Sequence, residues 1–342
     1  MKKLSLILIS TIGSLLLAEC CARWVGLQPY HLPDFHFTSE PNGCFGKDSL
    51  GLTLIPGKFV VDVNNGLVHK VTHGRDSFRI TSFTENSDSL KPSIFMYGCS
   101  YTYGQGVDDE KTYPFLVQNK LPSYIVHNYA VPGYGTQQPF LLLKKALASG
   151  ERPEIVVLNY ADFHEERNVL SRSFEYKLYQ GFQQVGSILN RDLDSTCMIY
   201  PRTQLITDSL RFQFVNVLED FKPFPLREYS SLMNQVDRLI SFGNDREELP
   251  PKYSKNLIKA IQSLCTEYHI TFIVAEVGDM ACDKEMADFC EIETIFYVNI
   301  APDFSAGTFR NLPYDYHPNE SAHQHYAESL TEFLYGIMSR TK

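Results

Sequence analysis

From residue 93 to the C-terminus, short apolar segments alternate with longer amphipathic ones. The apolar segments have four to six residues each and are 94–97, 125–129, 155–158 and 272–277, with 296–300 as a weaker fifth. Strands that alternate with helices form parallel sheets that carry helices on both faces. The sequence therefore predicts one large α/β domain over residues 93–342.

Certain residues mark where the helices of this domain should begin. Pro114 suits a first helical turn, because proline lacks an N–H and the N–H groups of the first turn make no hydrogen bond within the helix. Ser254 and Asn319 carry side chains that cap helix N-termini. After Asn319, apolar residues at helical spacing predict a packed C-terminal helix, and they are Ala322, Ala327, Leu330, Phe333, Leu334, Ile337 and Met338.

More than a hundred residues separate the third predicted strand from the fourth, which is too many for one crossover helix. We therefore predict an insertion at about 165–250. Its aromatic residues form either a lid over the site or, as we favour, a small core of the insertion's own. They include Phe174, Tyr176, Tyr179, Phe182, Phe212, Phe214, Phe221 and Phe224.

The segment before the α/β domain has a different character. Residues 27–92 are rich in glycine, proline, asparagine and β-branched residues. Within them, two short runs rich in β-branched residues, 59–63 and 67–71, lie on either side of Asn64-Asn65-Gly66, which predicts a hairpin on an Asn-Gly turn. We expect a β-rich N-terminal extension that leans on the main domain.

Residues 1–26 resemble an export signal. Lys2 and Lys3 precede an uncharged apolar run that ends at Glu19. The run is shorter than a usual membrane span, so a cleaved signal peptide and a retained membrane anchor both fit. We favour the anchor, because the residues after the run suit signal peptidase poorly. The remaining chain is expected to be extracytoplasmic, either periplasmic or at the cell surface, and associated with the membrane if the anchor stays.

Charge and motifs exclude several classes of function. The net charge is −9 and there is no run of basic residues, so we expect no nucleic-acid partner. No glycine-rich nucleotide-binding loop follows a strand, so we expect no cofactor. His323 and His325 lie two residues apart on a predicted helix and cannot easily share a metal ion, so we expect no metal. The eight cysteines show no zinc spacing, and Cys282 and Cys290 form either a disulfide or separate thiols.

Three residues carry the elements of nucleophilic catalysis. Ser100 follows the first predicted strand inside a glycine-flanked segment. Asp315 and His317 precede the C-terminal helix. A serine hydroxyl needs an imidazole to accept its proton, and the imidazole needs a carboxylate to fix its tautomer. The sequence thus predicts a Ser-His-Asp triad in the chain order Ser, Asp, His.

Three segments resemble conserved blocks of the SGNH, or GDSL-type, hydrolases. Residues 98–107 (GCSYTYGQGV) resemble the first block, 128–138 (NYAVPGYGTQQ) the second and 315–319 (DYHPN) the last. The resemblance covers about 93–163 and 254–340. It implies a flavodoxin-like three-layer α/β/α fold and an esterase, lipase or carbohydrate deacetylase activity.

The resemblance also implies a role for each matching residue. Ser100 would be the nucleophile, His317 the general base and Asp315 the residue that orients it. The backbone N–H groups of Ser100 and Gly133 would form the oxyanion hole. We expect an ester hydrolase that acts through an acyl-enzyme on O-acylated carbohydrate or small lipid-like esters. A carbohydrate O-acyltransferase is an alternative, as is a catalytically weak glycan-binding or assembly protein.

Two positions depart from the family pattern. Cys99 replaces an aspartate that is not the attacking group, and a thiol nucleophile there is the weaker interpretation. Ala161 occupies the place of the oxyanion asparagine in the third block. Loss of one oxyanion donor usually lowers the rate about a hundredfold to a thousandfold. Asn159 and His164 are the nearby candidates for a substitute, Asn159 because it lies two residues earlier on the same side of the strand.

Overall fold

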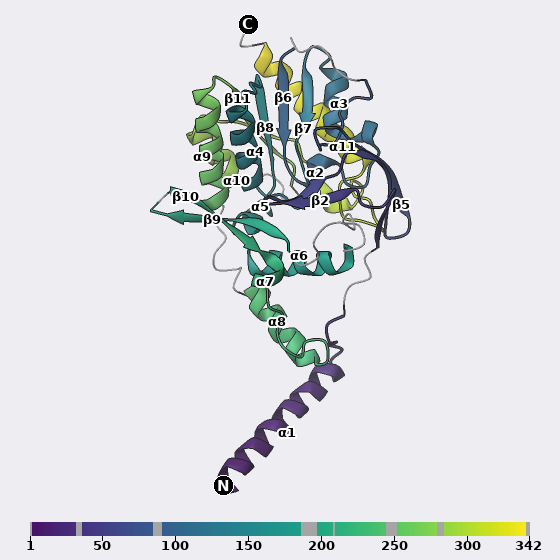
Figure 1. Cartoon of the computed structure of the whole chain (residues 1–342), viewed down its shortest axis with the longest axis vertical. Helices are drawn as coiled ribbons and strands as arrows, with labels where there is room; N and C mark the ends of the chain where they lie inside the picture. Colours follow the sequence, from purple (N-terminus) through teal and green to yellow (C-terminus); the bar gives the residue numbers. More distant parts are fainter. Residues whose placement is uncertain are drawn as a thin grey trace.

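The computed structural model describes most of the chain (Figure 1). The described residues are 2–31, 36–84, 91–185, 197–207, 209–243, 252–278 and 284–339. Cys282, whose pairing with Cys290 the sequence leaves open, and parts of the predicted insertion lie outside them.

A five-stranded parallel sheet forms the centre of the molecule. Its strands are β6 (Ser93–Tyr97), β7 (Ile125–Asn128), β8 (Ile155–Tyr160), β11 (Thr271–Glu276) and β12 (Phe296–Asn299). All five match predicted strands. They are hydrogen-bonded in the order β12-β11-β8-β6-β7, which in chain order is 5-4-3-1-2, as in flavodoxin-like sheets.

Helices cover both faces of this sheet and complete an α/β/α fold. Alternate residues of each strand point to opposite faces, so Ile94 and Met96 join one core, whereas Phe95 and Tyr97 join the other. Helices α3 (Tyr113–Lys120) and α11 (Glu320–Met338) pack on the first face. Helices α4 (Gln137–Ala148), α9 (Lys252–Glu267) and α10 (Lys284–Ile292) pack on the second.

Two of the predicted helix starts are correct and one is wrong. Pro114 lies in the first turn of α3, and the Asn319 side chain caps α11 by accepting from the Ala322 N–H. Ser254 lies inside the first turn of α9, where it does not cap the helix. The carboxylate of Glu165 caps α9 instead, because it accepts from the N–H groups of Tyr253 and Ser254 at 2.7 and 2.8 Å.

The N-terminal extension is β-rich, as predicted. Strands β1 (Phe37–Glu40), β4 (Gly57–Val63) and β5 (Leu67–His73) form an antiparallel sheet. The β4–β5 turn has Asn64 and Asn65 at φ of 53° and 55°, the left-handed geometry that Asn-Gly turns favour. Strands β2 (Phe45–Asp48) and β3 (Gly51–Leu54) form a second hairpin.

Several elements separate β8 from α9, in the region predicted to be an insertion. They are α5 (His164–Asn168), α6 (Arg172–Val185), β9 (Ile199–Ile206), β10 (Ser209–Asn216), α7 (Val217–Asp220) and α8 (Ser231–Gly243). Phe174 packs with Tyr200 in one small core, and Tyr176 packs with Phe221 in another. Phe174, Tyr176 and Phe221 therefore lie in small cores of this region, which agrees with the favoured interpretation. Phe212 instead stacks on Phe140 of α4, Phe182 also packs against the core of the extension, and Phe214 is half exposed.

Helix α1 (Lys2–Trp24) projects from the body at its base (Figure 1). Its residues Lys3–Trp24 are long and apolar enough to cross a membrane, and of these residues only Ala22, near the end of the helix, is buried. An N-terminal signal sequence meets the same criteria.

Candidate active site

Ser100, His317 and Asp315 meet at the carboxyl edge of the sheet. Ser100 is the first residue of α2 (Ser100–Tyr103), the short helix that follows β6. The His317 Nε2 atom lies 2.9 Å from the Ser100 Oγ atom. The His317 Nδ1 atom lies 2.8 Å from both carboxylate oxygens of Asp315. Residues 217 positions apart are thus arranged for a proton to pass from hydroxyl to imidazole.

The environment of Asp315 keeps its carboxyl ionised. Burial raises the pKa of Asp315, but the hydrogen bonds and charge of His317 outweigh burial, and the net pKa is lowered. Gln105 adds a further hydrogen bond from its Nε2 atom to Asp315 Oδ2 at 3.3 Å. An ionised carboxylate on Nδ1 holds the imidazole in the tautomer whose Nε2 can accept the serine proton.

Two backbone N–H groups are available beside the serine hydroxyl and on the neighbouring loop. Among the described residues, neither the Ser100 N–H nor the Gly133 N–H donates to any protein acceptor. Gly133 has φ of 84°, the left-handed region that glycine adopts without strain. A Cβ atom at Gly133 would lie 2.9 Å from the hydroxyl of Tyr200, so this position also lacks room for a side chain. Free N–H groups of this kind can bind an oxyanion.

Asn159 is occupied elsewhere. It is completely buried, and its Nδ2 atom donates to the Tyr97 carbonyl at 2.7 Å, directly below the turn that carries Ser100. Ala161, at the position of the missing asparagine, is also completely buried and packs in the sheet core. The geometry gives Asn159 a role in holding the turn, so we do not count it among the oxyanion donors.

The polar segment 162–168 joins helices and does not reach the triad. Glu165 caps α9, as described above. Asn168 Oδ1 accepts from the Thr136 N–H at 2.7 Å at the start of α4, and Arg167 donates to the Tyr134 carbonyl at 2.8 Å. His164 is completely buried, which lowers its pKa well below the usual value. This segment therefore braces the loop that carries Gly133, and the prediction that His164 substitutes for the asparagine has no support.

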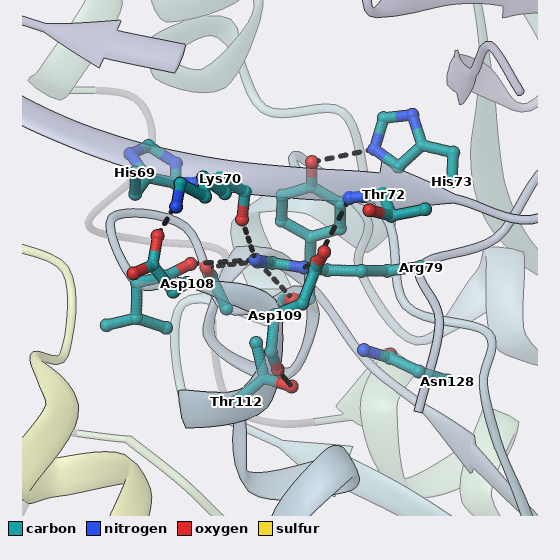
Figure 2. A network of polar contacts seen from close by, with 12 residues as sticks. His69, Lys70, Thr72, His73, Arg79, Asp108, Asp109, Thr112 and Asn128 are labelled. Carbon is teal, nitrogen blue, oxygen red and sulfur yellow. Dashed lines mark hydrogen bonds and ion pairs between the residues drawn. The ribbon is translucent and has the colours of Figure 1, made fainter. Parts of the chain in front are cut away.

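A buried arginine holds the loop that follows Ser100 (Figure 2). Arg79 comes from the extension, and its side chain is fully excluded from solvent. Its Nε atom donates to Asp109 Oδ1 at 2.9 Å. Its other N–H groups donate to the carbonyls of Tyr103, Gly104, Lys70 and Val107 at 2.5 to 3.1 Å. All five guanidinium N–H groups thus have partners, and four of the five are in residues 103–109.

Two buried histidines of the extension support the same loop. His73 accepts from the Tyr103 hydroxyl at 2.9 Å (Figure 2), and His69 Nε2 accepts from the Gly106 N–H at 3.3 Å. Burial lowers the pKa of both histidines to about 4, so both are neutral near pH 7. Because Gln105 lies between the anchored residues, the extension fixes the residue that donates to Asp315.

Aromatic side chains flank the imidazole. The Tyr101 ring lies edge-on to His317 at 5.7 Å and to Phe163 at 5.4 Å between ring centres. Phe304 lies 6.4 Å from Tyr101. Tyr316, next to His317, is largely exposed. This side of the triad is therefore apolar and packs against the sheet core.

Other chemistry has less support in the described part of the chain. Cys99 is completely buried, and the imidazole is hydrogen-bonded to the Ser100 hydroxyl. His323 Nδ1 accepts from the Tyr113 N–H at 3.1 Å inside the core. Within the described ranges, no group of three or more histidine, cysteine, aspartate or glutamate side chains could hold a metal ion.

No protein-family model and no curated protein matches this chain. Solved structures do resemble it. A lipolytic G-D-S-L family member from Veillonella parvula is 14% identical with a TM-score of 0.39, over 70% of this chain and 96% of that one. The psychrotrophic esterase EstA from Pseudoalteromonas is 12% identical with a TM-score of 0.37, over 73% of this chain and all of that one.

The structural neighbours are SGNH-type lipolytic proteins and esterases. A further one, an SGNH-hydrolase family esterase, is 12% identical with a TM-score of 0.34. It is matched over 73% of this chain and 95% of its own. At this level of similarity the neighbours do not tell which reaction this chain catalyses. The function has to be argued from the geometry around Ser100.

The sequence gives little or no indication of the contacts that two residues, Gln105 and Arg79, make in the site. Gln105 lies inside the first SGNH-like segment, but nothing in its spacing indicates a contact with Asp315. Arg79 is one of two arginines in the β-rich segment, and its partners in the loop after Ser100 lie about 25 to 30 positions away. Only the folded arrangement brings them together.

Proposed function

We propose that this chain is a serine ester hydrolase, anchored by α1 in a membrane with its catalytic domain outside the cytoplasm. The observation that carries the proposal is the 2.9 Å contact between Ser100 Oγ and His317 Nε2, with Asp315 on the far side of the ring. A serine that is not catalytic has no need of this arrangement.

The proposed reaction has two steps. Ser100 Oγ attacks the ester carbonyl while His317 Nε2 accepts its proton, and the N–H groups of Ser100 and Gly133 bind the oxygen as it becomes negative. His317 then returns the proton to the leaving alcohol, and an acyl-enzyme remains. Water, activated by the same imidazole, releases the acid. Asp315 stays ionised throughout and stabilises the imidazolium.

The oxyanion site has two backbone donors in this proposal and no third donor from the side chain at 161. Loss of one donor usually costs about a hundredfold to a thousandfold in rate. We therefore expect slow turnover of simple esters. The half-buried aromatic residues Tyr101 and Phe163 favour a substrate with an apolar part next to the scissile bond, either a small lipid-like ester or an O-acylated carbohydrate.

Hydrolysis of p-nitrophenyl acetate, butyrate and octanoate by the full chain in detergent tests this proposal. The wild type should release nitrophenol and Ser100→Ala should not. Cys99→Ala is the matched control, because it removes the neighbouring nucleophile and should retain activity. Activity in Ser100→Ala that is lost in Cys99→Ala would instead make the thiol the nucleophile.

A further inference from the structure

Helix α1 is attached to the folded body by polar contacts. Near its end, the Glu19 carboxylate accepts from the Ser230 hydroxyl at 2.7 Å and from the N–H groups of Ser231 and Leu232, both at 2.9 Å. Glu19 thereby caps α8, which begins at Ser231. Arg23 pairs with Glu19 at 2.6 Å and donates to the Tyr229 carbonyl at 2.8 Å.

The chain that follows α1 continues this attachment. The Leu27 carbonyl accepts from the Ser231 hydroxyl at 3.0 Å, and the Gln28 carbonyl accepts from Asn234 at 2.9 Å. The Tyr30 N–H donates to the Arg227 carbonyl at 2.8 Å, and the Arg227 guanidinium lies 4.0 Å from the Tyr30 ring centre. The end of α1 and the start of α8 therefore form one packed unit, which Figure 1 shows at the base of the body.

This unit exposes large apolar side chains. Trp24 is 87% exposed, Tyr229 75%, Leu226 67% and Val25 64%. We call these four residues the basal patch. Leu226 has φ of 63°, a conformation that costs a leucine about 1 kcal/mol or more, so the backbone is strained at this exposed position. In the loop from Phe224 to Ser230 the one exposed charged side chain is Glu228.

The basal patch lies close to the level at which α1 would enter a bilayer. The apolar run from Leu4 to Ala18 rises about 22 Å as a helix, whereas the hydrocarbon core of a bilayer is about 30 Å thick. A short span draws the bilayer surface toward its ends. The six residues from Glu19 to Trp24 rise about 9 Å further, which is slightly more than the depth of one headgroup layer, about 5–7.5 Å. The basal patch lies at this level, where tryptophan and tyrosine are enriched.

We propose that the basal patch rests in the headgroup layer of the phospholipid bilayer that α1 enters, so that the α8 region is a second membrane contact. The contact is largely apolar, because the neighbouring charged side chains are Glu228 and Arg23, and Arg23 is paired with Glu19. Figure 1 shows α2, with Ser100, at the edge of the sheet that faces α6 and α7. The docked molecule therefore holds its candidate active site toward the bilayer. The proposal depends on the anchoring part of the proposed function and not on its chemistry.

Trp24 is the only tryptophan in the chain, which makes a direct test available. In a full-length Trp24→Phe background, Tyr229→Trp places a single reporter in the basal patch. Ile292→Trp places one at a matched position, because Ile292 is 78% exposed at the end of α10, next to the edge where the parallel strands begin. Each protein is reconstituted into phosphatidylcholine vesicles that contain phosphatidylcholine brominated near the headgroup.

The Tyr229→Trp emission should be strongly quenched, and Ile292→Trp should keep its full emission. A tryptophan at the other exposed apolar residue of the loop, introduced as Leu226→Trp, should be quenched as well. Equal emission from Tyr229→Trp and Ile292→Trp, in protein that floats with the vesicles, would overturn the proposal. Failure to float with the vesicles would overturn the anchoring itself, and esterase activity measured in detergent would be unaffected by either result.

Discussion

Arg79 and Asp109 form an ion pair from which water is almost entirely excluded. The Nε to Oδ1 distance is 2.9 Å, and the exposed fractions of the two side chains are 0% and 3%. One partner comes from the β-rich extension and the other from the loop between α2 and α3. Because the same guanidinium holds the carbonyls of residues 103, 104 and 107, the extension is part of the support of the candidate site.

Arg79→Ala should lower the free energy of unfolding by about 3–5 kcal/mol, because it leaves the Asp109 carboxylate buried without its partner. Urea denaturation followed by circular dichroism measures this loss. Lys284→Ala is the matched control. It removes an ion pair with Asp288 whose side chains are 86% and 54% exposed, so it should change the free energy of unfolding by well under about 1 kcal/mol. Equal losses in the two variants would contradict the role given to Arg79.

His73 should make stability depend on pH. Its folded pKa of about 4 lies below the ordinary 6.5, because burial disfavours the charged ring. Between these values the unfolded chain binds a proton that the folded chain does not, so stability falls as the pH is lowered from 6.5 to 4. The contribution is fully present above pH 6.5.

His73→Gln should make the slope of unfolding free energy against pH shallower in this window by up to about 1.4 kcal/mol per pH unit. Urea titrations of both proteins at several pH values give the two slopes, and contributions from other groups cancel in the difference. Parallel slopes would show that His73 is not held neutral.

Gln105→Leu should lower kcat by about tenfold, because it removes one hydrogen bond from the Asp315 carboxylate and leaves the Ser100–His317 contact in place. The readout is ester hydrolysis at saturating substrate. Gln324→Leu changes an exposed glutamine of α11 that is bonded to Glu328, and it should leave kcat unchanged. A wild-type kcat in Gln105→Leu would remove Gln105 from the support of the triad.

Gly133→Ala should lower kcat by about a hundredfold or more, because the new Cβ must displace the loop that carries a proposed oxyanion donor. The atom it meets is the Tyr200 hydroxyl. Tyr200→Phe alone should retain most activity, and Tyr200→Phe added to Gly133→Ala should recover part of the loss. Full activity in Gly133→Ala would place the oxyanion hole elsewhere.

Local patterns in the sequence predict much of this fold. The five strands are short apolar runs bounded by turns, and the three central strands β6, β8 and β11 are continuous apolar runs because they are buried on both faces. Asn64 and Asn65 adopt the turn that their residue types favour. Asn319 caps α11 for the same local reason. Signals of this kind depend on neighbours in sequence and so can be found without the structure.

The support of the candidate site has no such signal. Glu165 caps α9, although it lies 89 positions before Ser254 in the sequence. Glu19 caps α8, although it lies more than 200 positions before Ser231. Ser254 has the residue type of a cap, so the sequence predicts it wrongly, and only the tertiary fold shows that a distant carboxylate takes the role. Arg79 reaches its partners across the boundary between extension and sheet. These contacts depend on packing, which local propensity does not encode.

Labelling with a fluorophosphonate probe tests the central claim most directly, because the probe reacts with a serine only when a neighbouring base activates it. The full-length protein in detergent should be labelled, and Cys99→Ala should be labelled equally. Ser100→Ala and His317→Ala, each shown to be folded by circular dichroism, should not be labelled. Labelling that persists in Ser100→Ala, or a folded wild type that is not labelled at all, would contradict an activated Ser100.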